Sequence, residues 1–177
     1  MKLFKLTDSD FCTHKNTKWG ENVTQSVTGE VILCKNALHA YTDPRLAVIF
    51  NPIHSGFTNP ILWEAEGNVV VKDHTKVGCD RLTTIRQIPI PKISNEQLVK
   101  FAILCAKKVC IDKKFNDWAD KWLSGEDRTG ESALRAADAA DDTNAAYYAA
   151  VASDVAYTAS YININLIEVL DEALQTN

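Results

Sequence analysis

Residues 61–71 read ILWEAEGNVVV, and this stretch decides the fold class of the first half of the chain. Aromatic and β-branched residues bounded by turn-forming residues are typical of β-strands. Gly67 interrupts the run and predicts either a β-bulge or a tight turn before the three valines. The same composition predicts further short strands at residues 2–6, 30–33 and 82–90. The first half of the chain is therefore expected to contain a small sheet.

A short helix is expected among these strands, at residues 44–50. Asp43 can cap the free N–H groups at its start, and Pro44 suits the first helical position. Asn51 and Pro52 should end it. Strands combined with a helix make residues 1–92 a mixed α+β domain.

Three further helices are expected in the second half. Ser94 and Gln97 form a capping-box pattern ahead of apolar residues at helical spacing. Asp112 can cap the next helix, which Gly125 should end. Apolar residues recur at helical spacing in the final segment, residues 162–174. Together these signals predict that the chain from Ser94 onward is almost entirely helical.

Alanine dominates residues 132–160, where it fills 12 of 29 positions. Alanine has the highest helix propensity, and its small side chain lets helices approach closely. Capping residues near Thr143 predict a break in this run. The expected fold class is α+β, with a small mixed or antiparallel sheet domain (residues 1–92) followed by an alanine-rich helical domain (residues 93–177). The sequence leaves open whether the two pack as one compact unit.

The composition narrows the classes of function. The 177 residues are 46% hydrophobic and 24% charged, which is ordinary for a globular protein. The chain has no apolar run long enough to span a membrane and starts without a signal-peptide pattern, so we expect a cytoplasmic protein with no membrane partner. Residues 93–177 carry 8 basic and 14 acidic side chains, which disfavours nucleic acid as a partner.

Familiar catalytic and cofactor motifs are absent. The sequence has no glycine-rich phosphate loop, no GxSxG elbow, no HExxH and no CxxC. Cysteine and histidine lie close together at three places, which are Cys12/His14, Cys34/His39 and His74/Cys79. The spacing of these pairs differs from that of zinc ribbons and fingers. We therefore expect no metal and no cofactor, and we favour binding over catalysis.

Aromatic and ionisable residues gather in two short segments, 38–44 and 63–66. Such side chains can stack on a flat ligand, donate and accept hydrogen bonds, or act as acid and base. The candidates for contact with a nucleotide-like ligand are His39, Tyr41, Trp63, Glu64 and Trp19. The alternative is that the first segment only orients a turn into the helix and that the glutamates of the second face solvent.

Several segments resemble a family of uncharacterised phage and prophage proteins. The shared pattern covers residues 33–34, 38–47, 51–54, 60–67, 76–79 and 82–84, and extends to the alanine-rich tail. The resemblance implies a mobile-element origin and a location in the host cytosol. The leading hypothesis is a non-enzymatic, phage-type accessory protein that binds a host protein or a small nucleotide-like ligand, with the countering of host defence as a role.

A looser resemblance concerns the order of elements. A strand, the helix at residues 44–50 and a strand at residues 62–67 are similar to the middle of ADP-ribosyltransferase domains. That family uses His or Arg on a first strand, Tyr or Ser on a second, and often a later Glu. Here Lys5 and Thr7 stand on the first strand.

This second resemblance implies an alternative function. It is an ADP-ribosyltransferase-like enzyme whose nicotinamide-nucleotide pocket is lined by His39, Tyr41 and Glu64. A structural component of the virion is a third alternative. The sequence leaves the molecular target and the oligomeric state open.

Overall fold

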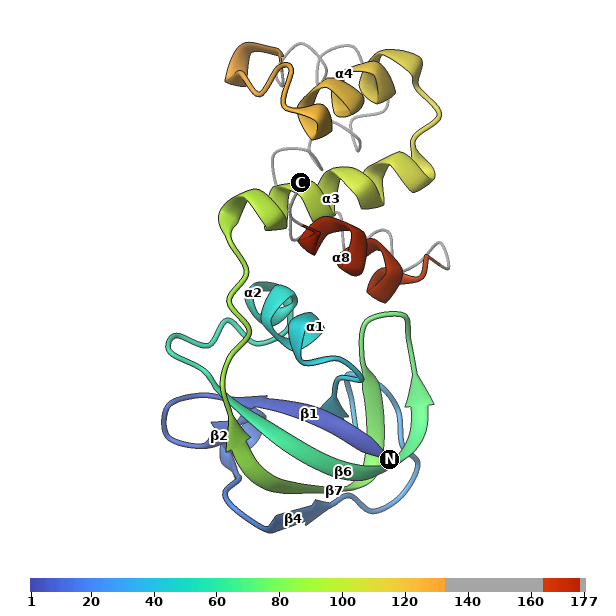
Figure 1. Ribbon diagram of the computed structural model, residues 1–177. Coiled ribbons are helices and arrows are strands. Elements are labelled where there is room, and N and C mark those ends of the chain that lie inside the picture. The colour runs from blue at the N-terminus through green and yellow to red at the C-terminus, as the bar shows by residue number, and fades with distance from the viewer. Residues whose placement is uncertain (133–163, 176–177) are drawn as a thin grey trace. The chain divides into compact units, whose positions relative to one another are not determined.

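The structure, a computed structural model, describes residues 1–132 and 164–175 (Figure 1). The chain divides into two compact units, Met1–Lys92 and Ile93–Asn177. The first unit contains an antiparallel sheet and two short helices, and the described part of the second contains helices. The chain is therefore of the α+β class. In the described ranges, no helix has the length and apolar character needed to cross a membrane.

Five strands form the main sheet of the first unit. They are β1 (Lys2–Thr7), β4 (Val23–Ser26), β5 (Leu38–Ala40), β6 (Ile61–Lys72) and β7 (Val77–Ile88). Neighbouring strands run antiparallel in the order β1-β6-β7-β4, and β5 also pairs with β7. β4 pairs with residues 81–84 of β7 and β5 with residues 77–79, so the two short strands follow one another along one edge of β7.

A second, two-stranded sheet lies between β1 and β4 in the chain. It pairs β2 (Cys12–Thr13) with β3 (Thr17–Lys18), and the turn that joins them is the 3-10 helix η1 (His14–Asn16). Two consecutive residues of this turn, Lys15 and Asn16, have positive φ angles of 60° and 55°. The short hairpin therefore turns through a left-handed backbone that residues other than glycine seldom adopt.

The main sheet closes on itself through Tyr41. The Phe4 N–H donates to the Tyr41 carbonyl at 2.8 Å, and the Tyr41 N–H donates to the Phe4 carbonyl at 2.8 Å. Phe4 belongs to β1, and Tyr41 directly follows β5. The strands β1, β6, β7 and β5 therefore form a closed ring.

The long β6–β7 hairpin can curve into this ring because it is irregular. Its pairing shifts register at three places, one of them between Asn68 and Val69. A Cβ atom at Gly67 would lie 2.8 Å from Leu82 Cδ1, so glycine allows the two strands to approach closely. The bulge predicted near Gly67 is thus present, whereas β6 continues to Lys72 without the alternative tight turn.

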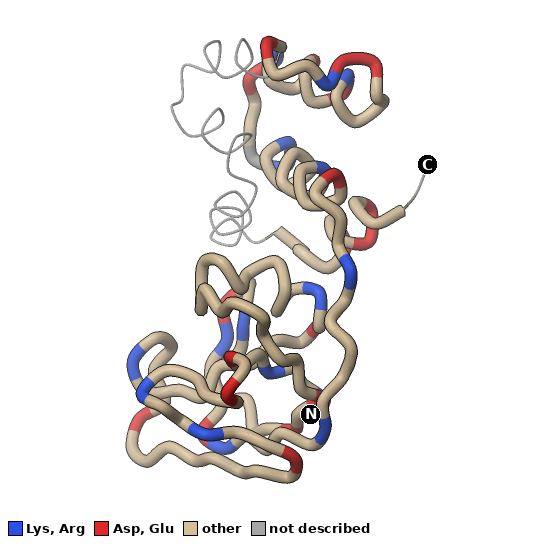
Figure 2. Tube along the Cα trace, turned by 90° about the vertical axis from the view of Figure 1, so that its left-hand side faces the viewer, with Lys and Arg blue, Asp and Glu red and all other residues tan. Residues whose placement is uncertain are grey.

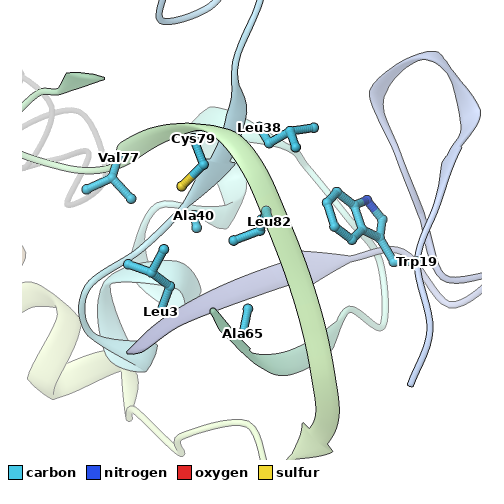
Figure 3. Close-up of a cluster of buried hydrophobic side chains, with 8 residues drawn as sticks. All are labelled: Leu3, Trp19, Leu38, Ala40, Ala65, Val77, Cys79 and Leu82. Carbon is cyan, nitrogen blue, oxygen red and sulfur yellow. The ribbon is translucent and has the colours of Figure 1, made fainter. Parts of the chain in front are cut away.

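Inward-facing side chains of the strands, together with Trp19 directly after β3, build a small core (Figure 3). Its members are Leu3, Trp19, Leu38, Ala40, Ala65, Val77, Cys79 and Leu82. Side chains alternate along a strand, so Leu3 shares its face of β1 with Lys5 and Thr7, and all three are buried. The inner face of β1 is therefore apolar at its start and polar farther along.

Two short helices, α1 (Pro44–Ile49) and α2 (Asn51–His54), lie on the same side of the sheet (Figure 1). The Arg45 N–H donates to the Asp43 carboxylate at 2.8 Å, which confirms the predicted helix start. α1 packs against β1 and buries Leu46 and Ile49. These contacts fix the end of α2, where His54 lies.

The described part of the second unit contains α3 (Asn95–Val109), α4 (Lys113–Ser124) and α8 (Leu166–Leu174). The predicted capping box is confirmed, since the Gln97 N–H donates to Ser94 Oγ at 3.2 Å and the Ser94 N–H donates to Gln97 Oε1 at 2.9 Å. Asp112 caps α4, and Gly125 ends it with a φ of 81°. The helices predicted over the alanine run, with a break near Thr143, lie outside the described residues.

Some strand predictions were wrong. Residues 30–33 do not form a strand, because Ile32 makes only an isolated bridge to Asn36 across a turn at residues 33–35, in which the Asn36 N–H donates to the Ile32 carbonyl at 2.9 Å. The strand expected at residues 82–90 instead spans Val77–Ile88. The sequence also missed β2, β3, β4 and β5, which have two to four residues each and are too short to show a periodicity.

Candidate functional site

A pocket of about 380 Å³ opens in the first unit. Most of its wall comes from the middle of β1, residues 13–17 around η1, residues 35–41 around β5, the end of α2, and Lys76 in the turn before β7. A cavity of this size suits a small organic ligand. The closed ring of strands brings these distant segments together.

Cationic and imidazole side chains dominate the wall of this pocket. The described residues that line it include four lysines and three histidines but no aspartate or glutamate. They are Lys5, Lys15, Lys35, Lys76, His14, His39 and His54. Figure 2 shows that both basic (blue) and acidic (red) residues occur along the trace of this unit. The excess of positive charge is therefore a property of the pocket rather than of the unit.

Lys5 is the most buried cation of the pocket, with 7% of its surface exposed. Its ammonium donates to the His39 carbonyl at 2.6 Å and lies 5.0 Å from the ring centre of Trp19. Burial lowers the pKa of Lys5 from 10.5 to about 8, because an ammonium loses hydration in the interior. No carboxylate of the described residues forms an ion pair with it, so Lys5 is charged at neutral pH without a counter-charge.

Lys76 is 8% exposed and belongs to the turn between β6 and β7. The Asp73 carboxylate shapes this turn, accepting the N–H groups of Thr75 at 2.7 Å and Lys76 at 2.8 Å. Burial by itself raises the pKa of Asp73, but these hydrogen bonds and the charge of Lys76 bring it below its usual value. Asp73 is therefore ionised at neutral pH and offsets part of the charge of Lys76.

The positive charges of both buried lysines act on the His39 ring. Burial, and after it the charges of Lys76 and Lys5, lower the pKa of His39 from 6.5 to about 4. Its Nε2 accepts the Cys34 N–H at 3.1 Å, so the proton of the neutral ring lies on Nδ1. The ring is thus a neutral hydrogen-bond donor at physiological pH.

Tyr41 and His54 form a polar pair in the wall. The Tyr41 hydroxyl lies 2.9 Å from His54 Nδ1, and the His54 ring stacks on Phe50 with the centroids 5.1 Å apart. Burial raises the pKa of Tyr41, and it lowers the pKa of His54 to about 4. Neither group is tuned to exchange protons near pH 7, which is the range that favours acid–base catalysis.

Of the five residues predicted to contact a ligand, the structure places His39 and Tyr41 in the pocket and Trp19, Trp63 and Glu64 outside its wall. Trp63 is 1% exposed, and its Nε1–H donates to Thr7 Oγ1 at 3.1 Å. Trp19 belongs to the core, behind Lys5. Neither indole can stack on a ligand in this pocket, because neither reaches the wall.

Glu64 is held on another part of the sheet. Its carboxylate pairs with Lys2 at 3.0 Å and with Arg86 at 2.7 Å. The hydrogen bond from Lys2, followed by that from Arg86, lowers the pKa of Glu64. The sequence correctly predicted a strand here, but pairing with two cations keeps this carboxylate away from the pocket.

Three polar side chains of the pocket, Lys5, Lys76 and His54, were not among the predicted site residues. For Lys5 the sequence did contain a signal, because period-two alternation places it on the same face as Leu3 and Thr7. A lysine on the inner face of a strand is uncommon unless its charge has a use. Lys76 and His54 carried no such signal, since a turn and a short helix have no face defined by the sequence.

Comparisons with protein-family models, with curated proteins and with solved structures found no match. The site therefore has to be interpreted from its own chemistry. The described residues contain no group of three or more His, Cys, Asp or Glu side chains arranged to hold a metal ion. The first unit is an α+β domain with a cationic, concave site.

Proposed function

We propose that the first unit binds a small anionic, nucleotide-like ligand in this pocket without transforming it. The observation that supports the proposal is the buried Lys5 ammonium in a wall whose described residues include no carboxylate. Removing an ammonium from water is unfavourable unless an opposite charge replaces the lost hydration. A bound anion supplies that charge.

The remainder of the wall suits an organic ligand. Leu38, Phe57 and Val27 contribute apolar surface, and His39 and Tyr41 contribute neutral polar groups. A planar, partly apolar molecule with an anionic group matches both parts. Within the hypothesis of a phage-type accessory protein, a concave site of this size favours a small molecule over a host protein as the partner.

The transferase alternative has less support from the geometry. It requires Glu64 in the pocket, and the Glu64 carboxylate instead pairs with Lys2 and Arg86. His39 and His54, whose pKa values burial lowers to about 4, are weak bases at neutral pH. Binding without chemistry accounts for these features better than group transfer does.

Isothermal titration calorimetry of the full chain tests the proposal, with ATP, NAD, a cyclic dinucleotide and inorganic phosphate as probes. We expect at least one of them to bind. Lys5→Met should weaken that binding by roughly tenfold or more, because a hydrogen bond to a charged group contributes about 1.5–3 kcal/mol.

Lys72→Met is the matched control. Lys72 is exposed at the end of β6, next to the turn that carries Lys76, and it does not line the pocket. This variant should bind like the parent. The proposal fails if none of the four probes binds, or if Lys5→Met binds as tightly as Lys72→Met.

A further inference from the structure

The four lysines of the pocket lie at two depths. Lys5 and Lys76 are buried, at 7% and 8% exposure, whereas Lys15 and Lys35 are exposed. The buried pair comes from β1 (Lys5) and from the turn between β6 and β7 (Lys76). The exposed pair comes from η1 (Lys15) and from the segment before β5 (Lys35). The pocket therefore has a cationic inner end and a cationic rim.

The two positive charges of the inner end both lie near the His39 ring. The charges of Lys5 and Lys76 both lower the pKa of the His39 ring, and the charge of Asp73 opposes them in part. Asp73 offsets part of the charge of Lys76, and Lys5 has no carboxylate partner in the described part of the chain. An anionic group beside His39 would interact with both lysines at once.

Lys15 and the residue before Lys35 have a left-handed backbone conformation. Lys15 has φ 60° and ψ 29°, and Lys35 follows Cys34, whose φ is 63°. L-residues seldom adopt this left-handed conformation, and where it occurs it often accompanies a ligand site. The Cys34 N–H also donates to His39 Nε2, so the segment that carries Lys35 is tied directly to the inner end of the pocket.

We infer that the ligand carries a chain of two or more linked phosphates, with one end at Lys5 and Lys76 and the other at Lys15 and Lys35. The inference rests on the proposed function and names its ligand class. A single phosphate would fill a small part of a cavity of about 380 Å³ and would meet one pair of lysines. A phosphate chain meets both pairs and matches the repeated positive charge along the wall.

The experiment measures affinity against phosphate number by calorimetry, in two series. AMP, ADP and ATP form the nucleotide series, and phosphate, pyrophosphate and tripolyphosphate form the inorganic series. We expect affinity to rise with phosphate number in at least one series. In the Lys15→Met/Lys35→Met double variant, affinity for the triphosphate should fall on the order of tenfold, while affinity for the monophosphate stays within about twofold, as expected for two exposed ion pairs.

Both rim side chains are exposed, so the double variant should keep the fold, and far-ultraviolet circular dichroism checks that it does. A rise confined to the nucleotide series identifies a nucleotide as the ligand, and a rise in both identifies the phosphate chain as the recognised group. The inference is overturned if monophosphate and triphosphate bind equally in the parent, or if the double variant keeps the full dependence on phosphate number. Failure of every probe to bind refutes the proposed function itself.

Discussion

Replacing Lys5 with Met should stabilise the first unit at neutral pH, although it removes a residue of the pocket. Burial lowers the pKa of Lys5 from 10.5 to about 8. At roughly 1.4 kcal/mol per pKa unit, the charged ammonium destabilises the folded state by about 3 kcal/mol well below pH 8. Losing the hydrogen bond from the charged ammonium to the His39 carbonyl costs about 1.5–3 kcal/mol, so the expected net gain is about 1 kcal/mol.

Because of this pKa shift, the stability gained through Lys5→Met depends on pH. Unfolding takes up protons between pH 8 and pH 10.5, because the Lys5 pKa is lower in the folded state than in the unfolded state. The penalty of the parent is therefore complete below pH 8 and disappears as pH rises through this window. We expect this penalty to fall from about 3 kcal/mol at pH 6.5 to about 1 kcal/mol at pH 9.5, where it no longer exceeds the cost of the lost hydrogen bond and the variant has no advantage.

Urea unfolding of the full chain at a series of pH values, followed by tryptophan fluorescence, measures this difference. The comparison must be between variant and parent, since Cys79, whose pKa burial raises to about 11, titrates in both. Lys72→Met is the control for removing an exposed lysine from the same unit. A variant that is less stable than the parent at pH 6.5, or a difference that does not change with pH, would show that Lys5 has a counter-charge and would refute the reasoning.

Two further predictions concern the ring of strands. Gly67→Ala should destabilise the first unit by about 1–3 kcal/mol in urea unfolding, because the added Cβ would lie 2.8 Å from Leu82 Cδ1 and 3.0 Å from the Arg81 carbonyl. Gly130→Ala is its control, since a Cβ there meets nothing within 4 Å, and equal effects of the two would contradict the close approach. Tyr41→Phe should cost about 1 kcal/mol by losing the contact of its hydroxyl with His54 Nδ1, and an unchanged urea midpoint would mean that water replaces this contact at no cost.

The sequence predicted the elements whose signals are local. Asp43, Ser94 and Asp112 each cap the start of a helix by accepting an N–H two or three residues further on, and all three caps are present in the structure. Gly125 ends α4 with a left-handed backbone, as predicted. The two long strands were located but not bounded correctly. β7 begins at Val77, where its neighbours β5 and β6 supply the hydrogen bonds, and such partners are invisible in a single sequence.

The site was harder to predict because it depends on which distant segments the ring of strands brings together. His39 and Tyr41 were identified from a local cluster of polar and aromatic residues. Trp63 and Glu64 lie outside the wall, since the indole is buried against Thr7 and the carboxylate is paired with Lys2 and Arg86. The sequence pattern around these residues looks the same in either case.

Lys5 connects the stability of the fold with the proposed binding. A methionine at this position would fill the interior without the desolvation of an ammonium, and the ring of Trp19 at 5.0 Å offsets only part of that penalty. The positive charge therefore weakens the unliganded domain. A bound anion beside Lys5 would raise its pKa again and recover this free energy, so the same desolvation that destabilises the fold adds to the affinity for an anion. This reciprocity is the physical reason for proposing an anionic ligand for the pocket. It predicts that Lys5→Met is more stable than the unliganded parent but not more stable than the parent saturated with ligand.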